Sequence, residues 1–122
     1  MPIKIYVQGE KGDIAAFVDE TGKSDVIDFI ESLPDSDQKK VANLFNLFCQ
    51  QGRIWNEVKF KKEEGPIWAF KSFQVRILCA FLPRKPKPTV LLLHGLHKKA
   101  DKLSRSDLDK AKLIFENILK SN

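Results

Sequence analysis

The stretch TVLLLHGLH, residues 89–97, is apolar at successive positions, so a strand built from it would be apolar on both faces. A strand that is buried on both faces lies in the middle of a sheet. We therefore predict that residues 89–97 form the central strand of a sheet.

Three segments before this strand also have β character. QVRILCAFL (74–82) alternates apolar residues with others, and PIWAFK (66–71) is a short strand after a Gly-Pro break. IWNEVKFKK (54–62) predicts a strand with Asn56 and Phe60 on one face and Lys59 and Lys61 on the other. PRKPKP (83–88) holds three prolines, which predict an exposed basic loop.

The amino-terminal half predicts a β-hairpin (3–8 and 14–19) followed by two helices. Ser24 is a suitable N-cap for the first helix, which ends before Pro34. For the second helix we expect Asp35 to be the N-cap with Gln38 as its capping-box partner, and Gly52 to close the carboxyl end.

The carboxyl-terminal segment predicts a third helix. Ser104 and Asp107 have capping-box spacing, and the apolar residues that follow recur at helical intervals: Leu108, Ala111, Phe115 and Ile118. The chain of 122 residues therefore predicts one α+β domain, residues 1–122, with an N-terminal β-hairpin, an αα-hairpin, a mostly antiparallel sheet and a C-terminal helix.

Composition excludes several classes of protein. No apolar run approaches the roughly 18 residues of a membrane span, and the first residues lack the apolar core of a signal peptide, so we expect a cytoplasmic protein without a membrane partner. Cys49 and Cys79 lie in apolar contexts and are expected to be reduced core thiols. The two cysteines and two histidines have no zinc spacing, so we expect no metal and no cofactor.

Positive charge is concentrated in the predicted sheet. Residues 1–52 carry 5 basic and 9 acidic side chains, whereas residues 53–105 carry 13 basic and 4 acidic side chains. This asymmetry indicates one positively charged face, which is a feature of nucleic-acid-binding proteins.

Arg76 is a charged residue inside an otherwise apolar strand. Burying it without a partner would cost several kcal/mol, about 3 or more. It either forms a salt bridge with Glu57, Glu63 or Glu64, or presents its guanidinium to an open groove that binds phosphate. Lys71 and Arg76 flank a predicted turn at Ser72-Phe73, so Lys71 could lie opposite Arg76 on the paired strand.

Basic residues before and after these strands extend the cluster. They are Lys59, Lys61 and Lys62 on one side and Lys98 and Lys99, with His97, on the other. The charges beside His97 would favour its neutral form, which can accept a proton. His94, on the apolar strand, is expected to have a structural role, and His97 and its lysines could also be an ordinary surface loop.

Four stretches of the sequence resemble one known family. They are SDVIDFIESLP, KFKKEEGPIWAF, QVRILCAF and, most specifically, TVLLLHGLHKKADKLSRSDLDKAKLIFEN. They resemble the HigB branch of the RelE/ParE toxin superfamily, including its phage-derived members, over residues 3–119. The resemblance implies a microbial-ribonuclease-like fold and a type II toxin that enters the ribosomal A site. Such a toxin cuts messenger RNA with the neighbouring 2′-OH as nucleophile and without a metal.

The resemblance also suggests roles for individual residues. Arg76 matches a strand arginine that contacts the scissile phosphate, and Lys98 and Lys99 match a basic pair after the last strand. Arg76 and Lys99 would stabilise the phosphorane-like transition state, and Lys71, His97 or Lys98 would accept the proton. The family's active-site tyrosine has no counterpart here, so we expect stacking of RNA bases on Trp55, Trp68 or Phe73, with Lys59, Lys61 and Lys62 also binding RNA.

The expected partners are a cognate helix-turn-helix antitoxin and the ribosome with its messenger RNA, and the protein is expected as a monomer or in a toxin–antitoxin hetero-oligomer. Two other functions fit the same superfamily. One is a ParE-like toxin that poisons DNA gyrase and cuts no RNA. The other is a repurposed module that keeps only antitoxin recognition.

Overall fold

The computed structural model describes residues 3–83 and 86–121. Six strands form one sheet in the order β1-β2-β6-β5-β4-β3. Their bounds are β1 (Ile3–Gln8), β2 (Asp13–Phe17), β3 (Phe60–Glu64), β4 (Ile67–Ser72), β5 (Val75–Leu82) and β6 (Thr89–His97). The predicted central position of residues 89–97 is confirmed, because β6 lies between β2 and β5 and its residues 90–92 are fully buried.

The sheet is mostly antiparallel, as predicted, with one exception. β1 and β2 form the predicted hairpin, and β3 to β6 follow one another as antiparallel neighbours. β2 runs parallel to β6, with Asp13 opposite Thr89 and Ala16 opposite Leu92. This pairing joins the amino-terminal hairpin to the later strands in a single sheet.

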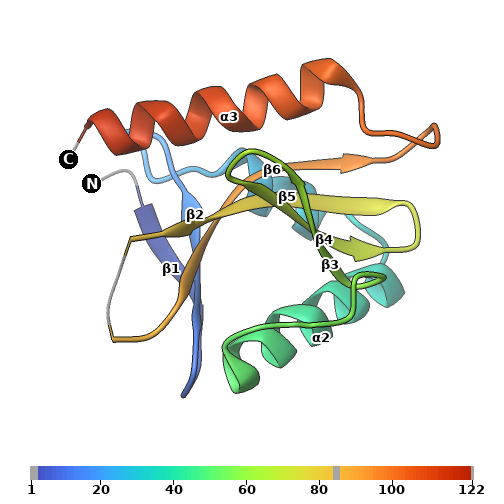
Figure 1. Ribbon diagram of the computed structural model, residues 1–122, viewed down its shortest axis with the longest axis horizontal. Helices are drawn as coiled ribbons and strands as arrows, with labels where there is room; N and C mark the ends of the chain where they lie inside the picture. Colours follow the sequence, from blue (N-terminus) through green and yellow to red (C-terminus); the bar gives the residue numbers. More distant parts are fainter. Residues whose placement is uncertain (1–2, 84–85, 122) are drawn as a thin grey trace.

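Helices cover both faces of the sheet (Figure 1). On one face, α1 (Asp25–Glu31) and α2 (Asp35–Gln51) pack over a core rich in phenylalanine, which includes Phe45, Phe48, Phe60 and Phe70. On the other face, α3 (Arg105–Lys120) packs through Ala111, Phe115 and Ile118 against aliphatic residues of β5 and β6. The structure is the α+β fold that the sequence predicts.

The ends of the helices show where local signals hold and where they fail. The Ser24 hydroxyl accepts a hydrogen bond from the Ile27 amide, and Gly52 ends α2 with a φ of 77°, so both predicted caps are confirmed. The prediction of a capping box for α2 is wrong, because Pro34 occupies the N-cap position and no side chain caps the helix. The Gln38 amide instead donates to the carbonyl oxygens of residues 31 and 33, which α1 leaves free where it ends.

The strand predicted over residues 54–62 begins only at Phe60. The Asn56 side chain accepts a hydrogen bond from the Val58 amide, and its carbonyl accepts from the amides of Lys59 and Phe60. Asparagine side chains often compete with a strand ladder in this way, and the segment therefore turns before it joins the sheet. As a result Lys59 and Lys61 do not share a strand face.

The predicted basic loop is only partly exposed. Arg84 and Lys85 lie outside the described residues, whereas the Lys87 amine contacts the Asp13 carboxylate at 3.1 Å and donates to the Gly9 carbonyl at 2.6 Å. Lys87 is thus partly buried against the amino-terminal hairpin, and the prediction of an exposed loop is wrong at this position.

Both cysteines are free and buried, as predicted. Burial raises the pKa of Cys49 to about 11 and raises that of Cys79 as well. Within the described residues, no helix has the length and apolar character needed to cross a membrane.

Candidate nucleic-acid interface

The β4–β5 hairpin carries the two central basic residues. The register places Lys71 of β4 directly opposite Arg76 of β5, as the sequence suggests. Lys71 precedes and Arg76 follows a tight turn whose first residue, Phe73, has a φ of 53°. Because opposite residues of a ladder project to the same face, the two cations lie side by side.

Arg76 is 8% exposed, and protein backbone rather than a carboxylate holds it in place. One guanidinium nitrogen, Nη1, donates to the carbonyl oxygens of Phe73 and Val75, the latter at 3.0 Å. Among the described residues Arg76 forms no salt bridge, so the pairing with Glu57, Glu63 or Glu64 that the sequence left open is not formed. Burial lowers the pKa of Arg76, with Glu63 acting weakly in the opposite direction.

The remaining guanidinium nitrogens of Arg76 are available to a ligand. Neither Nε nor Nη2 donates to an acceptor among the described residues. No buried side-chain nitrogen or oxygen of those residues lacks a hydrogen-bond partner, so these two atoms reach solvent. An anchored guanidinium with free N–H groups can bind a phosphate through its planar fork.

Lys71 lies in a cationic environment. Its amine donates to the Glu57 carbonyl at 3.1 Å, which fixes the end of a flexible side chain. Partial burial and then the charge of Arg76 lower the pKa of Lys71, and Lys61 and Lys98 lower it further, whereas Glu63 raises it. The Lys71 amine therefore loses its proton more easily than an ordinary surface lysine.

The segment after β6 brings more cations to Arg76. The Lys98 amide donates to the Gln74 carbonyl at 2.6 Å, which continues the ladder past the end of β6 and places Lys98 beside the β4–β5 turn. Arg76 and Lys98 together line two hollows, of about 380 Å³ and about 320 Å³, and Lys99 lines the second. We call these two hollows together the cationic groove.

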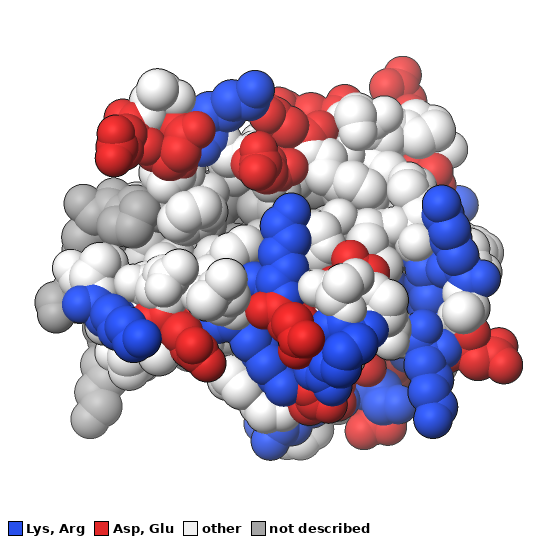
Figure 2. All heavy atoms as spheres, turned by 90° about the horizontal axis from the view of Figure 1, so that it is seen from above, with Lys and Arg blue, Asp and Glu red and all other residues white. Residues whose placement is uncertain are grey.

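The cationic groove lies on the α3 side of the sheet. It is lined by seven basic residues, Lys61, Lys71, Arg76, Lys98, Lys99, Lys102 and Arg105, and by three acidic ones, Glu63, Glu64 and Asp101. Figure 2 views this side of the molecule and shows lysine and arginine side chains gathered over its lower centre and right, with acidic side chains along the upper edge and also between the basic ones. Basic side chains from residues 53–105 thus gather on the α3 side of the sheet.

One carboxylate of the groove is already neutralised. Glu64 of β3 pairs with Arg105 and Lys112 of α3, and the hydrogen bonds from these two residues lower the pKa of Glu64 to about 2. The same contact raises the pKa of Arg105. This cluster attaches α3 to the edge strand β3 and closes one end of the groove.

Two of the predicted site residues do not line the groove. The exposed His97 ring packs 5.2 Å from the ring of Phe29, and His97 lines an adjoining hollow that shares Lys98, Lys99 and Lys102 with the groove but does not include Arg76. Trp68 stacks on Phe60 at a centroid distance of 5.0 Å within the α2-side core.

The remaining predicted RNA-binding residues divide between the faces. Lys61 lines the groove, whereas Lys59 and Phe73 line a hollow next to α2, and the exposed Lys62 is the cross-strand partner of Trp68. Arg105 belongs to the groove without having been expected there. Its pairing with Glu64, 41 residues away in sequence, leaves no local signal.

His94 has the structural role that the sequence suggests. Its Nε2 lies 2.7 Å from Oδ1 of Asp107, in the first turn of α3, and the Asp107 amide donates to the Ser104 hydroxyl at 3.1 Å. This contact links β6 to the start of α3 and positions the segment that carries Lys98 and Lys99. Among the described residues, no group of three or more His, Cys, Asp or Glu side chains is placed to hold a metal ion.

Comparison with known proteins identifies the family of this chain. No curated protein matches the chain. Residues 28–116 match the family described as "Phage derived protein Gp49-like (DUF891)", and this span runs from α1 to α3 and includes every residue of the cationic groove. Because the match covers most of the chain, the protein belongs to the Gp49-like family of phage-derived proteins.

Proposed function

We propose that this protein is the toxin of a type II toxin–antitoxin pair, of the HigB-like branch of the RelE/ParE superfamily, and that it cuts messenger RNA in the ribosomal A site. The observation that carries the proposal is Arg76, a buried guanidinium anchored by backbone carbonyls with free N–H groups in the cationic groove. Membership of the Gp49-like family and the sequence resemblance support the same function.

The chemistry needs no group beyond the RNA and these side chains. The 2′-oxygen attacks the adjacent phosphorus, the bond from phosphorus to the 5′-oxygen breaks, and the products are a 2′,3′-cyclic phosphate and a 5′-hydroxyl end. Arg76, with Lys98 and Lys99, stabilises the negative charge that grows on the phosphoryl oxygens. A preorganised cationic site of this kind lowers the barrier because its charges do not need to reorient during the reaction.

Lys71 is the better candidate for the proton acceptor. It faces Arg76 across the ladder, and burial and the charge of Arg76 lower its pKa, so it gives up a proton more easily than an ordinary lysine. His97 lines no described hollow that contains Arg76. In the reaction the Lys71 amine takes the 2′-OH proton, and a proton from a neighbouring ammonium group or water goes to the leaving 5′-oxygen.

The expected partners follow from this function. They are a cognate antitoxin with a helix-turn-helix domain, and the ribosome with its messenger RNA. An antitoxin that places acidic side chains in the cationic groove would associate quickly, and its association rate would fall as salt is added.

A first prediction tests the role of Lys71. Lys71→Arg keeps the charge but replaces an amine whose pKa is lowered with a guanidinium that does not give up its proton, so we expect cleavage to fall by about 10²-fold or more. The measurement is the cleavage rate on ribosomes programmed with a messenger RNA. Lys62→Arg, on the neighbouring strand and outside the groove, is the control and should cleave at the wild-type rate. Wild-type cleavage by Lys71→Arg would exclude Lys71 as the base.

The cellular experiment is induced expression followed by primer extension on several abundant messenger RNAs. We expect new 5′ ends within translated regions, and none when translation initiation is blocked. Growth arrest with DNA damage signalling and without RNA cuts would support the gyrase-poisoning alternative instead. Antitoxin binding without either effect would support the repurposed module.

A further inference from the structure

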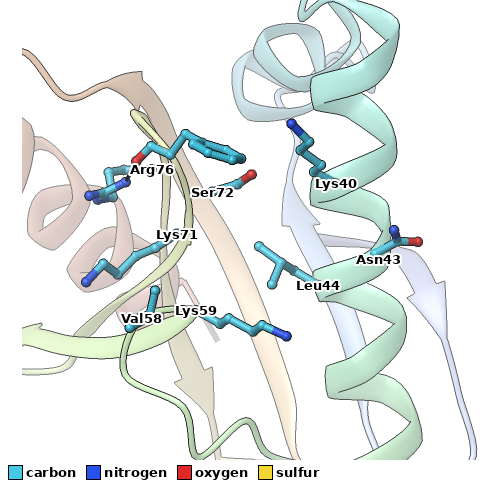
Figure 3. Close-up of a pocket in the computed structure, with 9 residues that line it drawn as sticks. Lys40, Asn43, Leu44, Val58, Lys59, Lys71, Ser72 and Arg76 are labelled. Carbon is cyan, nitrogen blue, oxygen red and sulfur yellow. Dashed lines mark hydrogen bonds between the residues drawn. The ribbon is translucent and has the colours of Figure 1, made fainter.

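A second hollow lies on the opposite side of the β4–β5 hairpin from the cationic groove. It has a volume of about 600 Å³ and is bounded by α2 on one side and by the hairpin and the segment before β3 on the other. Figure 3 shows Leu44 and Lys40 extending from α2 toward the hairpin, and Lys59 extending back toward α2. We call this hollow the hairpin pocket.

The walls of the hairpin pocket combine apolar surface with one sign of charge. Leu44, Val58 and Phe73 supply its apolar part, and Val58 and Phe73 are each 75% exposed. Four basic residues line it: Lys40 and Lys59 extend into the space between α2 and the hairpin, whereas Lys71 and Arg76 direct their charged groups away from α2 (Figure 3). Its nine described lining residues include no carboxylate. A ligand that matches these walls is flat and apolar in one part and anionic in another.

Phe73 is held in place by its surroundings. Its φ of 53° lies in the left-handed region, which bulky residues rarely adopt because the Cβ is crowded there. The Phe73 carbonyl accepts a hydrogen bond from Arg76, and the Lys40 amine lies 4.3 Å from the centre of the Phe73 ring. Such strain persists only where the surrounding structure fixes it, and here it holds an aromatic ring at the mouth of the pocket.

The hairpin pocket and the cationic groove share two residues. Arg76 and Lys71 line both, and in Figure 3 their charged groups extend from the hairpin on the side away from α2. A strand of RNA with a phosphate at Arg76 would therefore have the adjoining nucleotide at the hairpin turn.

We propose that the hairpin pocket binds one nucleobase of single-stranded RNA next to the cut, with the base against Phe73 and the flanking phosphate on Lys40 and Lys59. The position of this base next to a cleaved phosphate rests on the proposed function, but nucleotide binding in the pocket can be measured without cleavage. Stacking on an aromatic ring tolerates every base, so the pocket would add affinity with little sequence preference.

The direct test is an NMR titration of the intact protein with each of the four nucleoside 5′-monophosphates and, separately, with ribose 5-phosphate. We expect saturable shifts at Leu44, Val58 and Phe73 with the nucleotides, and smaller shifts confined to lysines with ribose 5-phosphate. Equal shifts with both probes would mean that only the anion binds, and no shift with any nucleotide would leave a protein partner as the occupant. Either result would overturn the proposal.

The variants are chosen so that the turn survives. Phe73→Asn removes the ring and keeps a residue that tolerates the left-handed region, and we expect it to weaken nucleotide binding by about fivefold or more. Phe73→Tyr should restore binding. Leu113→Ala is the control, since Leu113 is 59% exposed and does not line the pocket. Equal weakening by Phe73→Asn and Leu113→Ala would contradict a specific site.

Cleavage separates this inference from the proposed function. If wild-type protein cuts messenger RNA and Phe73→Asn cuts at the same rate with unchanged nucleotide affinity, the nuclease stands and the base pocket fails. If nothing is cut but nucleotides bind in a Phe73-dependent manner, the pocket stands and the nuclease fails.

Discussion

Two clusters of charge line the cationic groove, and they differ in what each cation faces. At one end Arg105 and Lys112 face Glu64, the pKa of Glu64 falls to about 2, and the contact attaches α3 to β3. Near the middle, Arg76 and Lys71 lie opposite each other on the ladder, burial lowers the pKa of both, and the charge of Arg76 lowers the pKa of Lys71 further. The first arrangement stabilises the fold, whereas the second costs folding free energy.

The difference indicates where a ligand belongs. Arg76 and Lys71 form no salt bridge among the described residues, and hydrogen bonds to backbone carbonyls hold both side chains in place although burial disfavours their charge. A bound phosphate would offset that cost. Perturbed charges of this kind gather at functional sites.

The largest expected effect is on cleavage by Arg76→Gln. Removing the guanidinium should lower the cleavage rate on programmed ribosomes by about 10²–10³-fold, because one preorganised charge at the transition state is lost. Arg53→Gln is the matched control, since Arg53 lies over the ring of Trp55 and lines no part of the groove. Thermal unfolding of both variants checks that they remain folded, and equal rates for the two folded variants would contradict the role of Arg76.

A smaller effect is expected on the pH dependence of cleavage when a neighbouring charge is removed. Lys61 lowers the pKa of Lys71, so Lys61→Gln should raise that pKa and leave less neutral amine at a given pH. The rising limb of the pH–rate profile should therefore move to higher pH. Lys62→Gln, one residue along the same strand, should leave the limb in place. A limb that is the same in both variants would mean that Lys71 is not the titrating group.

The smallest effect is expected at the paired cluster. The pKa of Glu64 is lowered in the folded protein, so its contribution to stability is complete above the ordinary carboxyl pKa and is lost as the pH falls toward about 2. Glu64→Gln should thus melt at a lower temperature than wild type at pH 7, and the two should converge near pH 2. Glu63→Gln is the control, and a difference between Glu64→Gln and wild type that persists at pH 2 would contradict the assignment.

The sequence predicts the fold better than it predicts the site. Runs such as residues 89–97 and residues 74–82 are determined by local alternation and burial, and the central strand and its neighbour are where the pattern places them. The predicted element boundaries are wrong where a polar side chain forms a hydrogen bond that the hydrophobic pattern of its own segment does not indicate. Asn56 bends the chain before β3, and Gln38 reaches back to α1 instead of capping its own helix.

The site depends on contacts between segments that are distant in the sequence, and such contacts cannot be predicted from local patterns. That Lys71 faces Arg76 follows from the short turn between them, so it could be predicted. Lys98 lies near Arg76 because the ladder continues past the end of β6. Arg105 pairs with Glu64 because α3 packs next to β3. Neither has a local signal, and the separation of His97 from Arg76 likewise becomes visible only in three dimensions.

The central claim is that Arg76 and the lysines of the groove hold the phosphate that the neighbouring 2′-OH attacks. The most direct measurement uses purified protein and ribosomes programmed with a messenger RNA that carries either ribose or 2′-deoxyribose at the cleaved position. We predict cleavage only with ribose, with a 2′,3′-cyclic phosphate on the upstream fragment, and loss of that cleavage in Arg76→Gln. Cleavage of the deoxy-substituted messenger, or undiminished cleavage by Arg76→Gln, would contradict the account.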